Sequence, residues 1–597
     1  MLDDFTKHEL NIETVKGDWP LNWAYYDEPG HRTGLIAGRE AHNRILAAER
    51  LSAGLMPSAG SKGYPAKAFE EAWKTNCWPD HGWGGNRGTL TDAYYVEAFV
   101  KSRDLADKLL NEAGAGLARA VPTKTSEQLP MVVYNPLSWP RTDVVRCRFE
   151  KPADWSSFSV RDGEGKEVPF EILGEASNAK TVEIAWLADN IPSVGYRTYY
   201  LVPANTPLPK ANPITGDTME NDFLRVVLGA GGMKSLYDRR LKLEMLKTDK
   251  FFGGEVLQFT APGFGWDDPE IVTTEDFDKT SHHDFRTLSF HQGPVMTTAV
   301  REAQFKHFRL RQAFRLYPRL DRVEVDVEIL DWDGPKAQEL RVAFPINLPK
   351  DSRLSYEVPF GTVEIGKDEI DFSLLPASKD CQFVSAVYGG DKALPFREAI
   401  NWIDASSDRY QNYGCLAASD CTVHLFEDQT DNPVSYPVLQ HVLLSTRKSQ
   451  AWNPDYWFTQ EGNHRFRMAL YPHRGGWRER YREGIAFNYP LQAFINSGTG
   501  RSDASLPPAG EFLRLSPANL IMTALKKSED DDSLSLRFFE AEGRANVRAR
   551  VQLSRPIKQA WKTNLIEEEP EPVRITADGV AELDIKPWEI VTMKLAV

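Results

Sequence analysis

The hydrophobic pattern of this 597-residue chain changes near residue 120, and that change constrains the fold more than any other feature. In residues 31–116, apolar side chains such as Leu35 and Ile45 recur at helical spacing. After Ala120 there is no long helical pattern. Short β-branched and aromatic runs such as TVEIAWL, RVEVDVEIL and SLSLRFFE follow, separated by turn residues. The sequence therefore predicts a mainly β fold with a small helical domain, in which a three-helix bundle precedes β-sandwich domains.

Polar and proline-rich segments suggest where the domains meet. TKTSEQ, VPANTPLPKANPITGDTMEN and SGTGRSDASLPPAGEF have the composition of linkers. The predicted units are a three-helix bundle, a small β domain, a large β-sandwich and a C-terminal β domain, at residues 31–120, 121–205, 215–500 and 510–597. Residues 1–30 resemble a strand end and an ordered loop, as if the chain began within a domain.

Composition excludes several classes of function. The net charge of −14 disfavours nucleic acid as a partner, because an acidic surface repels phosphate groups. No run of about 18 apolar residues indicates a transmembrane helix, and the N-terminus lacks the pattern of a signal peptide. Five cysteines without CxxC spacing suggest reduced, mostly buried thiols rather than a disulfide framework. We therefore expect a cytoplasmic protein with no membrane contact.

The stretch WPDHGWGGNRGTLTD at residues 78–92 places a histidine in a glycine-rich bend between two helical patterns. Glycines allow positive φ and close backbone approach, so His81 could present its imidazole outward. A neutral imidazole and a carboxylate are both ligands that Zn²⁺ accepts, but Asp80 and His81 alone cannot complete a site. The alternative is an Asp80–His81 hydrogen bond that stiffens the bend.

Other polar clusters favour structural interpretations. Neighbouring histidines on a strand point to opposite faces, which makes joint metal binding by His282 and His283 doubtful. Paired carboxylates are the usual machinery for cleaving glycosidic bonds, yet among 85 acidic residues such pairs arise by chance. The clusters expected to lie in loops, turns or the core are His282–Asp284, Asp267–Asp268, Asp331–Asp333, His464 and His473.

Several segments, taken in order, resemble glycoside hydrolase family 38, the α-mannosidases. GREAHNRILAAERLSAGL and YPAKAFEEAWK resemble the middle helical bundle of that family, and VVYNPLSWPRTDVV resembles the start of its first β domain. MENDFLRVVLGAGGMKSLYDRRLKLEML resembles the start of its large, mutarotase-like supersandwich. LRVAFPINL, YEVPFGTVE, HRFRMALYPHRGGW and KPWEIVTMKL fit as well. The resemblance covers nearly all of residues 15–597.

The resemblance implies a zinc-dependent retaining mechanism on α-mannosides. Family members carry an N-terminal catalytic barrel with the nucleophile, the general acid and three zinc ligands, and a histidine of the helical bundle supplies the fourth. His81 matches that histidine, and Asp80, Trp83 and Asp92 are substrate-side candidates. The catalytic barrel itself has no counterpart here, so residues 1–30 would be its remnant end and no catalytic residue lies in this chain. Zn²⁺ would then bind only together with a separate catalytic-barrel polypeptide.

Three functions follow as hypotheses. The first is the C-terminal portion of an α-mannosidase-like hydrolase, inactive alone, whose carbohydrate substrate is an α-mannoside. The second is a non-catalytic carbohydrate-binding or interaction protein built from the same sandwiches. The third is a sugar-active β-sandwich enzyme of mutarotase or lyase type. The first predicts an uncovered face around Asp80, His81 and Trp83, where a barrel would dock; a homo-oligomer is compatible with all three.

Overall fold

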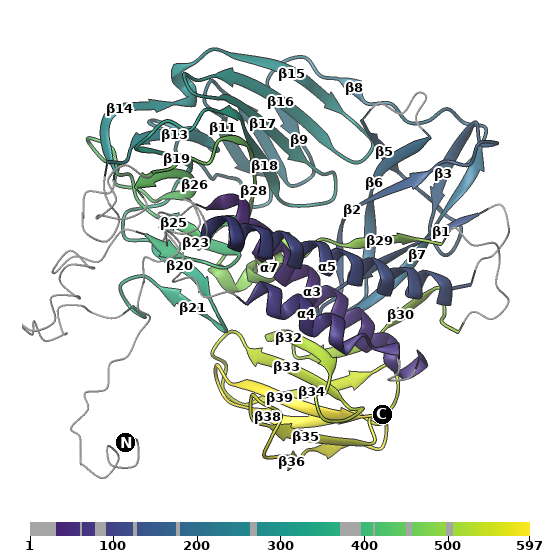
Figure 1. The fold of residues 1–597 in the computed structure, drawn as a ribbon. Coiled ribbons are helices and arrows are strands. Elements are labelled where there is room, and N and C mark those ends of the chain that lie inside the picture. Colours follow the sequence, from purple (N-terminus) through teal and green to yellow (C-terminus); the bar gives the residue numbers. More distant parts are fainter. Residues whose placement is uncertain are drawn as a thin grey trace, which may run out of the picture.

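The computed structural model describes residues 31–59, 63–77, 91–122, 128–174, 180–262, 272–369, 396–409, 412–448, 457–496 and 505–597. Strands dominate these residues, and long helices occur near the N-terminal end (Figure 1). The predicted fold class, a small helical domain followed by β-sandwich domains, is confirmed. Figure 1 shows the helices across the middle of the molecule, with β-sheets above, beside and below them.

The helical part consists of α3 (Arg32–Ala59), α4 (Ala66–Asn76) and α5 (Thr91–Ala120). Apolar side chains recur every three or four residues along α3, and Ile45, Ala48 and Leu51 are fully buried. One further helix, α7 (Tyr481–Asn488), lies after residue 120, where the sequence pattern indicated only strands and turns. With eight residues, α7 is too short to give a clear helical period.

Two glycines let the helices approach the β domains closely. A Cβ atom on Gly114 of α5 would lie 2.2 Å from the ring of Phe494, and one on Gly54 of α3 would lie 2.6 Å from the ring of Phe512. Both distances are far below van der Waals contact, so any larger residue would force the helix and the ring apart. The bundle is therefore docked on the β-sheets through ring-to-backbone contacts.

The large sandwich contains a long antiparallel sheet, a second sheet facing it, and a small sheet at the N-terminal side. The long sheet has the order β21 (Gly361–Glu364), β20 (Arg353–Val358), β23 (Trp402–Ser407), β24 (Tyr413–Ser419), β28 (Gly462–Arg474), β18 (Val323–Trp332), β17 (Arg309–Leu316), β16 (Thr297–Gln304), β15 (Phe285–Gln292) and β8 (Asn212–Pro213). The second sheet has the order β14 (Thr273–Lys279), β13 (Glu255–Thr260), β19 (Gln338–Pro345), β26 (Val438–Lys448), β25 (Val423–Leu425) and β22 (Arg397–Glu398), with β27 (Trp457–Phe458) on β26. The small sheet has the order β12 (Leu243–Glu244), β11 (Met233–Asp238), β10 (Leu224–Leu228) and β9 (Thr218–Glu220).

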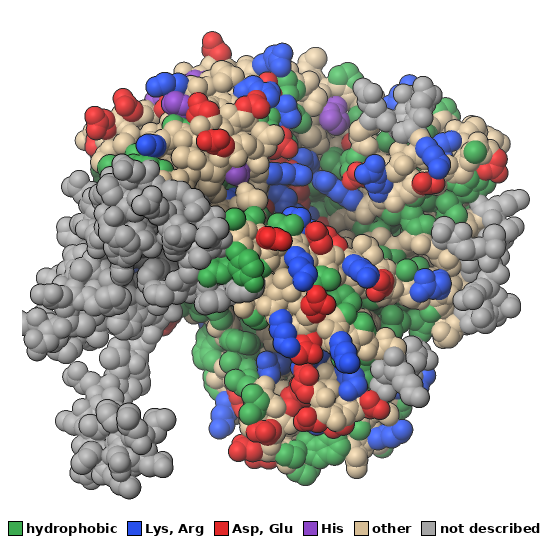
Figure 2. Space-filling view, viewed as in Figure 1, with side chains coloured by type: hydrophobic (Ala, Val, Ile, Leu, Met, Phe, Trp, Pro, Cys, Tyr) green, Lys and Arg blue, Asp and Glu red, His purple; other side chains and the backbone are tan. Residues whose placement is uncertain are grey.

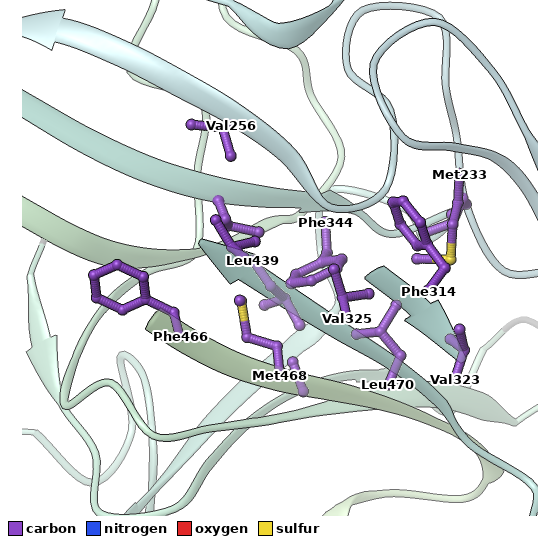
Figure 3. Close-up of a cluster of buried hydrophobic side chains, with 14 of the residues drawn as sticks. Met233, Val256, Phe314, Val323, Val325, Phe344, Leu439, Phe466, Met468 and Leu470 are labelled. Carbon is purple, nitrogen blue, oxygen red and sulfur yellow. The ribbon is translucent and has the colours of Figure 1, made fainter. Parts of the chain in front are cut away.

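The inward faces of these sheets share one apolar core (Figure 3). Val323 and Val325 on β18 alternate with residues that face outward, as a strand with one buried face requires. Phe344 from β19 and Leu439 from β26 enter the same core from the opposite sheet. Burial of this extensive apolar surface is the main stabilising contribution to the sandwich.

The small β domain is not continuous in sequence. One sheet has the order β29 (Gln492–Ile495), β1 (Leu129–Asn135), β7 (Gly195–Ala204), β3 (Ser157–Arg161) and β4 (Glu167–Val168), with β30 (Ala509–Glu511) also on β7. The other has the order β2 (Arg141–Glu150), β6 (Thr181–Ile191) and β5 (Phe170–Leu173). The linker composition predicts that residues 492–495 belong to the large sandwich, which is wrong, because Phe494 pairs with Val132 of β1. Sequence order alone could not reveal this return of the chain.

The C-terminal sandwich packs directly against the helices. One sheet has the order β31 (Leu513–Ser516), β34 (Val547–Leu553), β38 (Ala581–Ile585) and β37 (Arg574–Ile575). The other has the order β32 (Leu520–Lys527), β33 (Leu534–Glu540), β39 (Ile590–Ala596), β35 (Gln559–Thr563) and β36 (Glu571–Pro572). Leu51 of α3 and Leu536 of β33 belong to the same apolar cluster. The helices and the C-terminal sandwich therefore share one core.

Two expectations from composition concern the membrane and the cysteines. In the described part of the chain, every helix is too short or too polar to span a bilayer. Cys147, Cys415 and Cys421 are buried, whereas Cys77 lies at the surface. Burial raises the pKa of Cys147 to about 12, so this thiol stays protonated and unreactive near neutral pH. Cys381 lies outside the described residues.

Candidate functional site

The residues singled out in the glycine-rich stretch fall mostly outside the described part of the chain. Asp80, His81 and Trp83 lie within residues 78–90, which the structure does not describe. Asp92 is the second residue of α5, and its side chain is not described. The metal role of His81 and the substrate-side roles of the other three therefore stay predictions.

A cavity of about 780 Å³ lies along one side of α4, from Ala66 to Cys77. Trp73 and Cys77, at the end of that helix, belong to its wall. The remaining wall comes from α3, the turn between β20 and β21, the end of α7, and strands β32 and β33. Figure 1 shows α3 and α4 passing over β32, with β20 and β21 beside them. The volume is within the usual range for small-molecule sites.

Glu49 is one of the polar side chains in the wall of this cavity. It lies on α3, is only 5% exposed, and accepts a hydrogen bond from Trp73 Nε1 at 3.0 Å. Burial raises the pKa of Glu49 to about 7, against the opposing effect of the Trp73 hydrogen bond. A carboxyl group with this pKa is available both as a donor and as an acceptor near neutral pH.

Glu357, near the end of β20, is a second polar side chain in this wall. Its Oε1 accepts a hydrogen bond from Asn401 Nδ2 at 3.2 Å. Its Oε2 is buried and has no hydrogen-bond partner among the described residues. Burial raises the pKa of Glu357 to about 8. Asn401 is held in turn by Asn488 Nδ2, which donates to its Oδ1 at 3.0 Å, so the amide orientation is fixed.

Arg50 connects the cavity wall to three parts of the fold. It is 2% exposed and donates to Pro136 O at 3.1 Å and to Thr523 O at 2.8 Å. Its guanidinium also lies 5.5 Å from the ring centre of Tyr489. Arg50 thus ties α3 to the segment after β1, to β32 and to the end of α7.

A second cavity, of about 470 Å³, lies on the other side of α3 and is rich in arginine. Figure 2 shows Lys and Arg side chains in the hollow between the large sandwich and the helices. Arg322 contacts Asp143 and Glu324 at 2.7 Å each, and Arg315 contacts Asp326 at 3.0 Å. Burial alone would raise the pKa of Asp143, but Arg322 and Arg141 hold it below its usual value. These paired charges join β2 to β18 and favour a structural role.

The histidine cluster at residues 282–284 differs from expectation. His282 and His283 were expected to point apart, as on a strand. They lie instead at the end of a short 3₁₀ helix, Thr280–His282, and both reach Asp278. His282 Nδ1 is 3.1 Å and His283 Nε2 is 2.7 Å from the two carboxylate oxygens. A tight turn brings neighbouring side chains to one side, which strand geometry does not. Asp284 is exposed.

The remaining polar candidates occupy structural positions. His464 donates from Nε2 to Gln460 O at 2.7 Å, and His473 Nε2 bonds to the buried carboxylate of Asp404 at 2.7 Å. Asp331 and Asp333 lie at a strand end, where Asp331 has a φ of 57° and pairs with an exposed arginine. Asp267 and Asp268 are outside the described residues. Across the residues that the structure describes, no group of three or more His, Cys, Asp or Glu side chains could hold a metal ion.

Sequence reasoning missed Glu49 and Glu357. Glu49 could have been found, because it follows Ala48 and precedes Leu51 on the apolar side of α3, where a carboxylate is unexpected. Glu357 carries no such signal, since it precedes a Val-Pro-Phe-Gly turn like any polar strand residue. Only the tertiary structure brings it to the same cavity as Glu49.

Two regions of the chain match known protein domains. Residues 219–371 match the domain described as "Glycosyl hydrolases family 38 C-terminal domain". Residues 519–593 match the "Glycosyl hydrolases family 38 C-terminal beta sandwich domain". Two regions of the chain thus match C-terminal domains of glycosyl hydrolase family 38. The first family 38 match covers β9 to β21 of the large sandwich, and the second covers most of the C-terminal sandwich.

Two curated proteins share sequence with this chain. "Alpha-mannosidase G" of Dictyostelium discoideum is 24% identical over 373 residues, which are 60% of this chain and 30% of that protein. "Alpha-mannosidase 2C1" of Homo sapiens is 28% identical over 204 residues, 33% of this chain and 18% of that protein. The matches therefore span less than a third of either relative.

Two solved structures share the fold of the whole chain. An α-mannosidase from Enterococcus faecalis V583 gives a TM-score of 0.73 at 16% identity, covering 100% of this chain and 72% of that one. A family 38 protein from Enterococcus faecalis gives 0.74 at 16% identity, with 100% and 74% covered. At this identity the likeness establishes the arrangement of the domains.

Proposed function

We propose that this chain is the C-terminal portion of an α-mannosidase-like glycoside hydrolase, which acts on terminal α-mannosides together with a catalytic barrel domain and is inactive alone. The observation that carries the proposal is the pair of family 38 matches, at residues 219–371 and 519–593. The names of the two curated relatives, both α-mannosidases, support the choice of substrate.

The described residues do not fit a zinc site by themselves, because no cluster of three or more suitable donors exists among them. The proposal therefore assigns a single zinc ligand, His81, to this chain and the remaining ligands to the barrel. In a retaining glycosidase, one carboxylate attacks the sugar and a second acts as acid and then base. Both would come from the barrel. This chain would supply a rigid wall and the stem from which residues 78–90 extend.

Hydrolysis of an aryl α-mannoside tests this proposal. The purified chain with added zinc should show no turnover. Coexpression with a family 38 barrel encoded beside it should restore hydrolysis, and His81→Ala should abolish the restored activity. His282→Ala is the matched control, because that exposed imidazole contacts only local residues and its loss should leave hydrolysis unchanged. Robust hydrolysis by the chain alone, lost on changing an acidic residue after residue 120, would overturn the proposal.

A non-catalytic carbohydrate-binding role is the second candidate. The cavity with Glu49 and Glu357 favours it, since aromatic walls with a few polar groups are typical of sugar sites. The two roles are separable, because a binding protein would bind sugar without ever requiring a barrel. A genuine barrel partner that docks on residues 78–90 would favour the hydrolase.

A further inference from the structure

We propose that the cavity bounded by α3, α4, the β20–β21 turn and β32 binds a neutral carbohydrate of one or two rings, through the side chains of Glu49, Trp73, Glu357 and Asn401. The choice of a sugar over other neutral polar ligands rests on the proposed function. The site itself is argued from its own contacts.

The charges of the cavity select a neutral ligand. Among the described residues, four Glu side chains and five Lys or Arg side chains border it. Most of them are already engaged: Lys74 contacts Glu70 at 2.5 Å, and Lys526 pairs with Glu529. Arg50 occupies the same wall as Glu49. A cationic ligand would face this group and the lysines, and an anionic ligand would face the carboxyl groups.

Glu49 and Glu357 are the exceptions, because neither forms an ion pair with any residue that the structure describes. Each has one oxygen held by a neutral donor, Trp73 Nε1 in one case and Asn401 Nδ2 in the other. The second oxygen of each is left for another partner. Burial raises both pKa values toward neutrality, so each carboxyl can accept from one hydroxyl and donate to another. Vicinal hydroxyl groups are the ligand chemistry that matches this pattern.

The remaining wall is apolar and aromatic. Tyr64, Trp73, Phe360 and Phe539 border the cavity, and Phe360 stays 38% exposed although it is a large apolar side chain. Phe360 also meets Phe539 edge to face, with ring centres 5.6 Å apart. An aromatic face packs against the C–H surface of a pyranose ring while polar groups bond its hydroxyls. Exposure of Phe360 at the mouth would be relieved by a bound ring.

The polar groups are also pre-positioned. Trp73 fixes Glu49, and the chain of Asn488, Asn401 and Glu357 fixes the other side. A site whose side chains are already ordered loses less conformational entropy when it binds a ligand. The cavity thus combines suitable volume, an aromatic wall and ordered hydrogen-bonding groups in one place.

Saturation-transfer NMR and calorimetric titration with methyl α-mannoside on the isolated chain test the site directly. We expect saturable binding in the millimolar range, which corresponds to about −4 kcal/mol. Glu357→Leu should weaken binding roughly 3- to 10-fold, because leucine has a similar size but can neither accept nor donate the hydrogen bond. Glu49→Leu should act in the same direction. The matched control is Glu40→Leu, on the opposite side of α3 beside the arginine-rich cavity, which should leave the affinity unchanged.

Both Leu substitutions keep the side-chain size, and circular dichroism and thermal melting verify that the variants fold. Absence of saturable binding up to about 100 mM sugar, well above millimolar affinity, overturns the proposal. Binding that Glu357→Leu and Glu49→Leu both leave unchanged places the sugar elsewhere and overturns it equally. Preferential binding of benzylamine, a cationic probe, would show that the cavity selects a cation and would overturn the choice of a neutral ligand. None of these results depends on hydrolysis, so the binding site and the proposed activity fail independently.

Discussion

Lowering the pH from 7 to 5 is expected to loosen strands β25 and β26 through the histidine pair His424 and His441. The two rings are fully buried on these paired strands, with Nδ1 atoms 2.7 Å apart. One Nδ1 must donate and the other accept, so the accepting imidazole must be neutral and the two rings cannot both be protonated in this geometry. Burial lowers the pKa of His441 to about 3, against a raising effect of Asp420. Burial, then His441 and Arg39, lower the pKa of His424 well below its usual value.

The sign and size of the effect follow from proton linkage. Both pKa values are depressed in the folded state, so the unfolded strands bind more protons, and stability falls as the pH drops below the unfolded value near 6.5. The loss continues down toward the folded pKa, about 3 for His441. Between pH 7 and pH 5, each histidine should cost about 2 kcal/mol, or about 4 kcal/mol for the pair.

Hydrogen-exchange mass spectrometry of peptides from β25 and β26 measures this loss locally. After correction for intrinsic exchange rates, protection should fall roughly 10²- to 10³-fold more in the wild type than in a His424→Leu, His441→Leu double variant. Replacing both hydrogen-bonding partners by apolar groups of similar size should change the protection at pH 7 only slightly. The effect of pH on carboxyl groups elsewhere is the same in both proteins, so it cancels in this comparison. Equal losses of protection in the two proteins would refute the reasoning.

Five other substitutions give independent checks by thermal melting. Gly114→Ala should destabilise by about 1–3 kcal/mol, because the new methyl group meets a phenylalanine ring at 2.2 Å. Gly116→Ala, where the same group meets nothing within 4 Å, should stabilise by about 0.5–1 kcal/mol. Arg322→Met should cost about 3 kcal/mol by leaving a buried carboxylate poorly compensated, whereas Arg309→Met at an exposed pair should leave the melting temperature unchanged. Burial raises the pKa of Glu357 to about 8, so its contribution to stability is complete below pH 4.5 and is lost as the pH rises through 8. Between pH 5 and pH 9, the free energy of unfolding should therefore fall more in the wild type than in the Glu357→Gln variant.

The sequence predicted the fold where local patterns decide the structure. Apolar spacing along α3 and α5 and alternation along β18 are local signals, and the helices and strands lie where these signals occur. The return of β29 and β30 to the small β domain has no local signal, because strand pairing there depends on long-range contacts. Two other differences are local: α7 has too few residues for a clear helical period, and the expected divergence of His282 and His283 assumed a strand where a 3₁₀ turn occurs.

The candidate site was predictable only in part. His81 came from an unusual glycine-rich stretch and a family resemblance, and its role as a zinc ligand stays a prediction. The two carboxyl groups of the cavity come from a helix residue, Glu49, and a strand residue, Glu357, which lie far apart in the sequence. Periodicity cannot assemble such a pair, because it reports which face of an element is buried and not what lies across from it.

The helix α3 explains why a docked barrel would meet a rigid platform. Near its start, Arg32 contacts Asp420 of the large sandwich at 3.1 Å. Near its middle, Arg50 bonds to Pro136 and Thr523, and beyond it Gly54 meets the ring of Phe512. One helix is therefore fixed to all three β domains at once, and α4 packs against it. A partner that docks on this frame meets side chains that are already ordered, which favours binding without a large entropic cost.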